Sequence, residues 1–221
     1  MGEVSRIPKV RPARFDATAE VPRYWWGGNA ALSHSINALS LLFPAGERFF
    51  VRSVRAYVDR LDDPELLARV RAFVGQEAQH GRAHEQAFSV LERQGYDVQG
   101  FLRWYEWLGY EVLEPNVPPV LRLAVTVALE HYTAILAEQA LDRAHLEAAH
   151  PALRDLLRWH AAEEIEHKSV AFDVLRAVDD RYVVRVAGLA VATVVLMLFW
   201  TAGTRHLVRD RKSTRLNSSH L

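Results

Sequence analysis

The chain has 221 residues, half of them hydrophobic, which is enough to bury a sizeable core in one domain. Lys plus Arg balance Asp plus Glu at 27 each, so no overall charge favours nucleic acid or another strongly charged partner. Because there is no cysteine, disulfides, thiolate-bound zinc, iron–sulfur clusters and a cysteine nucleophile are excluded. Any metal must therefore be held by His, Asp and Glu.

Residues 1–27 are predicted to form an irregular N-terminal arm. Its start is basic and is interrupted by Pro8 and Pro12, and no apolar run follows it. A secretory signal needs such an apolar run, so we expect a cytoplasmic protein. The arm ends in the aromatic residues 24–26 and two glycines.

The rest of the chain predicts an all-α fold, because helical patterns follow one another without strand-like alternation or hairpin signals. Predicted helices cover 29–61, with an interruption at Phe43-Pro44, then 64–93, 97–115, 120–144, 151–178 and 182–208. The clearest boundary is Asp62-Asp63-Pro64-Glu65, which supplies capping residues, a proline for the first turn and an acid near the positive helix end. We assign residues 28–180 to one helical domain and 181–209 to an apolar C-terminal helix.

Residues 210–221 follow that apolar helix without any periodicity. They read as the in-frame translation of a common short-read sequencing adapter. We therefore predict that 210–221 are a sequencing artefact and that the natural gene continues past Arg209. Sequencing of the source locus tests this, and a genuine stop codon after Leu221 would contradict it.

The C-terminal helix contains an uncharged, mostly apolar run over residues 186–204, with arginines on both sides of it. At about 1.5 Å per residue, this run is just long enough to cross the hydrocarbon core of a membrane. The sequence favours membrane contact through 186–204. The alternative is a fifth helix that is buried against the bundle.

Two Glu-x-x-His motifs, Glu77 to His80 and Glu164 to His167, lie inside predicted helices. Residues three apart share a helix face, so each motif directs a carboxylate and an imidazole toward one point. One such motif means little. A third copy, Glu147 to His150, stands directly before a proline and is predicted to be helix-end surface.

The spacing of two further glutamates makes the motifs informative. Glu47 and Glu77 have their midpoint at residue 62, inside one predicted turn, and Glu130 and Glu164 have theirs at 147, inside another. Residues equidistant from the turn of an antiparallel helix hairpin lie side by side. The sequence therefore predicts a two-metal site in a four-helix bundle. Its six ligands are Glu47, Glu77, His80, Glu130, Glu164 and His167. Four carboxylates and two imidazoles suit iron best, with manganese next and zinc less well.

Three more residues are candidates for a catalytic role. His84 follows His80 by four residues and His160 precedes Glu164 by four, so both project toward the site. They are predicted to be extra ligands, supporting partners or proton shuttles, with core histidines bonded to backbone carbonyls as the alternative. Glu163 is expected to replace or assist Glu164. A single zinc on Glu77, His80 and His84 is a competing interpretation.

The sequence resembles the bacterial proteins catalogued as predicted metal-dependent hydrolases, which are placed in the ferritin-like superfamily. Residues 39–50, 73–84 and 159–173 carry the resemblance, and Glu130 with Thr133-Ala134 fits the third helix. The resemblance covers residues 20–205 and implies a ferritin-like bundle with an aromatic crossover helix and an apolar C-terminal helix. By analogy with ferritin-like enzymes, Glu77 and Glu164 would bridge two metals, and Glu47 and Glu130 would each bind one.

Three functions remain open. The first is a metal-dependent hydrolase and the second an oxygen-activating di-iron oxidase or oxygenase. The third is a metal-storing or structural bundle. Aromatic residues in 101–107 are predicted to form the wall of a substrate pocket, which disfavours storage and favours a small apolar substrate. No nucleic-acid partner is expected, and the oligomeric state stays open.

Overall fold

A computed structural model describes residues 7–218 except 14 and 17, with the side chains of 143, 144 and 211–218 left out. The prediction of an all-α fold is confirmed, because the described residues contain no strand. The one bridge of β type among them is isolated and pairs Trp26, at the end of the arm, with Ala149.

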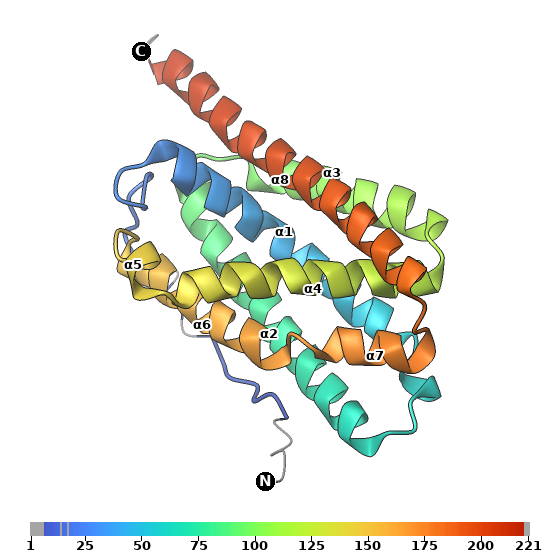
Figure 1. The fold of residues 1–221 in the computed structure, drawn as a ribbon. Helices are drawn as coiled ribbons and strands as arrows, with labels where there is room; N and C mark the ends of the chain where they lie inside the picture. The colour runs from blue at the N-terminus through green and yellow to red at the C-terminus, as the bar shows by residue number, and fades with distance from the viewer. Residues whose placement is uncertain (1–6, 14, 17, 219–221) are drawn as a thin grey trace.

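The main helices are α1 (Ala30–Arg55), α2 (Pro64–Arg93), α3 (Val98–Glu106), α4 (Pro119–Leu141), α5 (Arg143–Leu146), α6 (Pro151–His167), α7 (Val170–Val178) and α8 (Tyr182–Ser218). Between them lie the 3₁₀ turns η1 (Val58–Arg60) and η3 (Glu114–Asn116) and the π-helix η2 (Trp107–Leu113). Figure 1 shows α1 and α2 as one hairpin, α4 and α6 as a second, and α8 lying across α1 and α4.

The predicted boundary before α2 is confirmed: the Asp63 side chain accepts a hydrogen bond from the backbone N–H of Glu65 at 2.8 Å, and Pro64 begins the helix. Two other expectations need correction. Of a separate helix and a continuation from Pro44, the structure shows the continuation: α1 runs through Pro44, which is buried, and this burial outweighs the local cost of proline. The predicted helix 151–178 breaks at Lys168-Ser169, although no glycine or proline stands there.

The break after α6 has a tertiary cause. It turns α7 so that Val170, Ala171, Val174 and Leu175 enter the core beside α1 and α2, where all four are fully buried. Burial of these four aliphatic side chains outweighs the loss of about one or two helical hydrogen bonds. Sequence periodicity alone does not predict this change in helix direction between α6 and α7.

Helix α8 packs closely on the bundle along one side. Gly188 allows the approach, because a Cβ atom there would come within 2.6 Å of the backbone carbon of Ala124. The Trp200 indole donates to the carbonyl of Ser35 at 2.8 Å. Among the described residues, α4 and α8 are long and apolar enough to cross a membrane by length and composition.

Candidate metal centre

The six predicted ligand residues meet in the interior of the bundle, between the two hairpins. Glu47 comes from α1, Glu77 and His80 from α2, Glu130 from α4, and Glu164 and His167 from α6, and all six are buried. The two turn-centred halves therefore present their carboxylates and imidazoles at the same height. The spacing argument placed these side chains together without any knowledge of the packing.

Their ligand atoms form a continuous row. Three groups have atoms that all lie within 4.8 Å of one another: Glu77, Glu130 and His167; Glu77, His80 and Glu164; and Glu47, His80 and His160. Because Glu77 and His80 each belong to two groups, the three groups form one row. Each group also contains residues of both hairpins, so the row connects the hairpins. It contains all six predicted residues and adds His160.

His167 has one nitrogen facing this row. Its Nε2 lies 3.1 Å from Glu77 Oε1 and 3.4 Å from Glu130 Oε2, while its Nδ1 lies 3.0 Å from Gln76 Oε1. The Gln76 amide nitrogen donates to Glu166 at 3.1 Å, which fixes the amide oxygen toward His167. Since that oxygen can only accept, Nδ1 carries a proton, and Nε2 is the nitrogen that faces the carboxylates and can bind a metal ion. This is the tautomer that a metal ligand needs.

His80 has a similar support on its outer side. Its Nε2 lies 3.2 Å from Glu163 Oε2, which is an ion-pair distance although the angle is not that of a hydrogen bond, and its Nδ1 lies 3.5 Å from Glu164 Oε1. Glu163 accepts in turn from the Arg11 backbone N–H at 3.2 Å and from its guanidinium at 3.4 Å. The position of Glu163 therefore suits orientation of His80 better than replacement of Glu164.

The two supports are related by the pseudo-symmetry of the hairpins. Gln76 directly precedes Glu77 and holds His167, while Glu163 directly precedes Glu164 and faces His80. Each hairpin thus positions the histidine of the other. Sequence reasoning missed Gln76 and Arg11. The residue before each Glu-x-x-His motif was the available signal for Gln76, and nothing in the motif pointed to Arg11.

A Gln76→Ala variant tests this support. We expect metal affinity to fall by about 10–100-fold, because His167 loses the acceptor that fixes its tautomer. The matched control is Gln79→Ala, on the same helix but outside the hydrogen bonds just described. Competition with a chromophoric chelator measures the affinity, and equal affinities for both variants would contradict the role of Gln76.

The two surplus histidines form a chain that leads to the centre. Ser40 Oγ lies 2.6 Å from His84 Nδ1, His84 Nε2 lies 2.7 Å from His160 Nδ1, and His160 Nε2 lies 2.8 Å from Glu164 Oε1. The partners of both imidazoles are thus side chains. His84 belongs to none of the groups of potential metal ligands among the described residues, so the competing zinc set of Glu77, His80 and His84 finds no support.

Burial and crowding shape the charges of the carboxylates. Burial raises the pKa of Glu77 to about 8 and that of Glu130 to about 7. Burial, together with repulsion from Glu77 and Glu164, holds the pKa of Glu47 well above its ordinary value. For Glu164 the effect of burial is outweighed by His167 and His160, which hold its pKa well below the usual range. The metal-free centre therefore retains protons that metal ions would displace.

These residues fit metal ions. Both carboxylate oxygens of Glu47, Glu77 and Glu130, and Nε2 of His167, are buried without a hydrogen-bond partner among the described residues. Buried polar atoms nearly always have partners, and unpaired ones are costly. Cations between these atoms would satisfy them together. Gly81 leaves room for this arrangement, because a Cβ atom there would lie 3.3 Å from Glu47 Oε2.

An apolar cavity of about 340 Å³ adjoins the centre between α1, α4, α5 and α6. His160 and Glu164 form its inner end, and Leu39, Phe43 and Leu136 are among the apolar side chains that line it. A smaller cavity of about 60 Å³ reaches Glu47 and shares those three side chains. The cavities give the centre a mostly apolar neighbourhood for a bound molecule.

The predicted aromatic wall is only partly correct. Of residues 101–107, Tyr105 lines the smaller cavity beside Glu47. Phe101 and Trp104 instead line a surface groove between α3 and α8, and Trp107 is exposed. The aromatic helix lies against α8, so most of its rings face that helix and the surface.

A sequence model of the family described as "Predicted metal-dependent hydrolase" matches residues 9–220 of this chain. No curated protein and no solved structure gives a significant match. The matched range contains the arm with Arg11, all six buried ligand candidates and the apolar helix.

Proposed function

Because the chain belongs to the family of predicted metal-dependent hydrolases, we propose that it is an enzyme with a two-metal carboxylate centre beside an apolar substrate cavity. The observation that supports this most strongly is the row of buried carboxylate and imidazole atoms without hydrogen-bond partners. The proposed fold is a ferritin-like bundle, since two pseudo-symmetric hairpins each supply a Glu and a Glu-x-x-His motif.

We assign the bridging positions to Glu77 and Glu164. Glu77 belongs to two groups of potential ligands, and Glu164 Oε1 lies 3.5 Å from His80 Nδ1 and 3.6 Å from His167 Nε2. Glu47 and Glu130, at the two ends of the row, would each bind one metal. Iron is the metal that this oxygen-rich set suits best, with manganese as an alternative.

For hydrolysis, the bound metals would supply Lewis acidity and lower the pKa of a water molecule. The chain itself would orient the substrate and handle protons. The apolar cavity would hold the substrate body, and His160 Nε2, at the inner end of that cavity, is placed to accept or return a proton. His84 and Ser40 continue the hydrogen-bonded chain behind it.

Oxygen activation by a di-iron centre is a second candidate, favoured by the apolar lining of the cavity next to a carboxylate-rich site. An apolar substrate offers few groups for hydrolysis but many C–H bonds for oxidation. The two functions share the ligands and differ in the chemistry of the metal.

One experiment separates the candidates. Metal-free protein is loaded with Fe(II) without oxygen, the iron is counted, and the visible spectrum is followed after oxygen is added. Two irons per chain and no oxygen-dependent bands, with turnover of apolar esters or phosphoesters after Mn(II) loading, support hydrolysis. Oxygen-dependent bands support the second candidate. Only one iron per chain, or no stoichiometric iron, would contradict both.

Filling the cavity should separate substrate binding from metal binding. Ala137 is buried in the wall of the 340 Å³ cavity, so Ala137→Phe would place a ring inside it. We expect kcat/KM for the apolar substrate to fall by at least about tenfold with metal content unchanged. Steady-state kinetics with parallel metal analysis measures this. Unchanged kinetics would remove the cavity from the proposal.

A further inference from the structure

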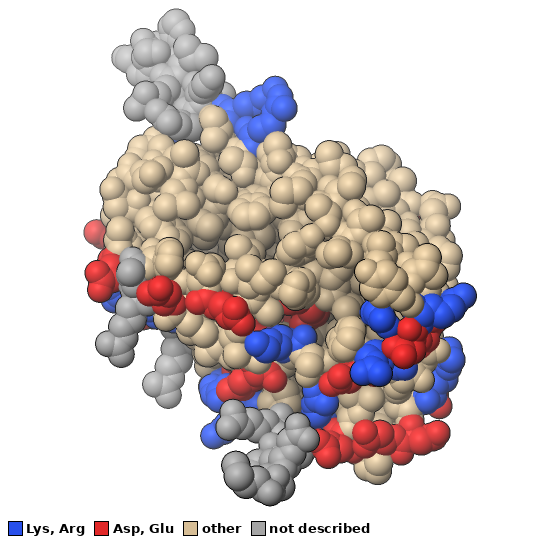
Figure 2. Space-filling model, viewed as in Figure 1, with Lys and Arg blue, Asp and Glu red and all other residues tan. Residues whose placement is uncertain are grey.

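The surface over α4 and α8 carries almost no charge. Figure 2 shows Lys, Arg, Asp and Glu gathered near α2, α6 and α7, while the part of the face over α4 and α8 is nearly free of them. Exposed large apolar side chains on these two helices are Ile135, Leu141, Tyr182, Val183, Val186, Leu189, Val194, Met197 and Leu198. Soluble monomers rarely expose an apolar surface of this extent unless it binds something.

Two tryptophans extend this surface beyond α8. Trp104 lies beside α8, with its ring 5.8 Å from that of Phe199, and is 41% exposed. Trp107, at the start of η2, is 56% exposed. Exposed tryptophans next to an apolar surface are typical of segments that sit at the boundary between lipid headgroups and acyl chains.

The packing of α8 suits a position along a membrane surface better than one across the bilayer. One side of α8 is covered by the bundle, where Ala192, Phe199 and Leu207 are buried. A crossing orientation would carry the neighbouring α1, with exposed ion pairs at Arg48 and Arg52, into the bilayer. A helix with one apolar side free and the other packed suits an in-plane position.

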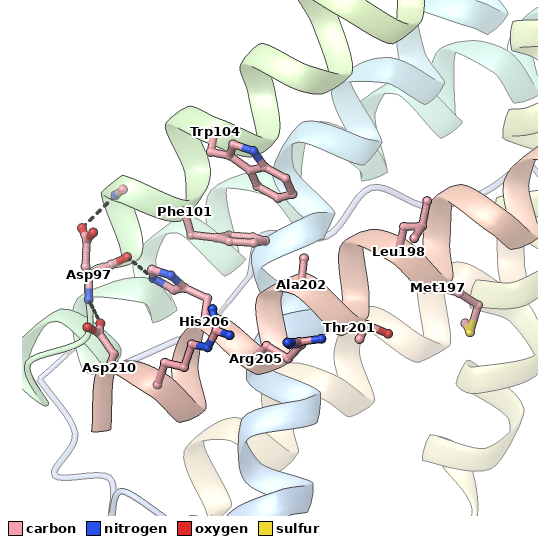
Figure 3. Close-up of a pocket in the computed structure, with 12 residues that line it drawn as sticks. Asp97, Phe101, Trp104, Met197, Leu198, Thr201, Ala202, Arg205, His206 and Asp210 are labelled. Atoms are coloured by element: carbon pink, nitrogen blue, oxygen red, sulfur yellow. Dashed lines mark hydrogen bonds between the residues drawn. The ribbon is translucent and has the colours of Figure 1, made fainter. Parts of the chain in front are cut away.

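A groove of about 1020 Å³ between α3 and α8 combines apolar and cationic walls. Figure 3 shows Phe101 and Trp104 from α3 facing α8, with Leu198 and Arg205 along the α8 side. Arg209 lies one turn beyond Arg205. Two carboxylates also line the groove, and both accept backbone hydrogen bonds: Asp97 from the Gly100 N–H at 2.8 Å and Asp210 from the Asp97 N–H at 2.6 Å.

The arginines at the two ends of α8 differ in their pairing. At its start, Arg181 pairs with Asp179 at 2.6 Å and Arg185 with Asp180 at 2.8 Å. Among the side chains that the structure describes, Arg205 has no ion pair, and neither does Arg209. Two free guanidinium groups at the end of an apolar groove complement an anionic headgroup that carries acyl chains.

We propose that α3 and α8 dock on the surface of an anionic phospholipid bilayer. Arg205 and Arg209 bind headgroup phosphates, while Trp104, Met197 and Leu198 enter the acyl region. Lipid is favoured over a second copy of this chain because exposed tryptophans, exposed aliphatic side chains and arginines without ion pairs follow one another along this surface, which is the order that a headgroup boundary selects.

Vesicle co-sedimentation of the metal-loaded full chain tests the proposal. We expect binding to vesicles of phosphatidylcholine mixed with phosphatidylglycerol, weaker binding to phosphatidylcholine alone, and weakening by salt. The double variant Arg205→Gln, Arg209→Gln should bind mixed vesicles about thirtyfold more weakly, since each arginine near an anionic surface contributes about 1 kcal/mol. Leu198→Asp should also weaken binding to them, because it places a charge among the acyl chains.

Matched controls act on other faces of the molecule. Arg71→Gln with Arg82→Gln removes two exposed arginines from α2, and Phe172→Asp changes an exposed apolar residue of α7. Both controls should bind vesicles as the unchanged chain does, and thermal melting confirms that every variant folds. No binding to mixed vesicles would overturn the proposal, and so would equal losses in the controls. A dimer that Leu198→Asp dissociates, without lipid binding, would identify a second copy as the occupant.

Discussion

The Glu77→Gln variant is expected to lose metal and gain stability at once. Glu77 belongs to two of the three groups of potential ligands, so both metals depend on it. We expect fewer than two metals per chain and an affinity loss larger than the about 10–100-fold that loss of a supporting residue causes. Turnover, of either proposed kind, should be lost with the metals.

The gain in stability has the same physical origin as the loss of metal. Burial raises the pKa of Glu77 to about 8, so an ionised carboxylate at this position is costly in the metal-free protein. Glutamine keeps the shape and removes the charge. At pH 9 the metal-free variant should melt at least about 4 °C above the metal-free unchanged protein.

The matched control is Glu147→Gln, which alters the exposed glutamate of the third Glu-x-x-His motif. It should change neither metal content nor melting temperature. Metal analysis by mass spectrometry and differential scanning calorimetry at pH 9 measure both effects. Retention of two metals by Glu77→Gln would show that the ligand assignment is wrong. A lower melting temperature in the metal-free state would show that Glu77 is paired rather than strained.

The centre could be predicted because its geometry is encoded locally. A Glu-x-x-His motif needs only a helix, and equal distances from a turn need only a hairpin with recognisable caps, such as Asp63 before Pro64. Both conditions are set by short-range sequence patterns. The proximity of the six side chains can therefore be predicted without knowledge of the rest of the fold.

The features that were missed depend on contacts between distant segments. Arg11 reaches Glu163 across 152 positions of sequence, and no periodic pattern reports such a contact. The break at Lys168-Ser169 follows from the burial of α7, and the continuity of α1 through Pro44 follows from the burial of Pro44. In each case tertiary packing overrides a local preference. Helical propensity describes only the local preference, so it does not predict these features.

The stability of the metal-free protein is expected to fall as pH rises from about 6.5 to 8. The unfolded chain has lost the protons of Glu130 and Glu77 near pH 4.5, whereas the folded chain loses them only near the raised pKa values, about 7 for Glu130 and about 8 for Glu77. The folded state thus binds more protons, so the free energy of unfolding decreases with pH. His167, whose pKa is also raised, contributes with the same sign.

The other buried groups act at lower pH. The pKa of His80 and that of His84 are lowered by burial, so both histidines destabilise the fold only below about pH 6.5. The lowered pKa of Glu164 costs stability only when pH falls below about 4.5. Neither effect reaches the range from 6.5 to 8, which leaves the raised pKa values of Glu130, Glu77 and His167 to set the slope there.

Metal loading should reverse the trend. Metal ions bind the deprotonated ligands and release their protons, so affinity rises with pH over the range in which the metal-free fold weakens. We expect the metal-free melting temperature to drop by about 2–4 °C per pH unit and the loaded one to stay level or rise. Paired melting curves from pH 6 to 8.5 measure the gap, and Glu77→Gln should flatten the metal-free slope. Parallel curves for loaded and metal-free protein would show that these carboxylates do not bind the metal.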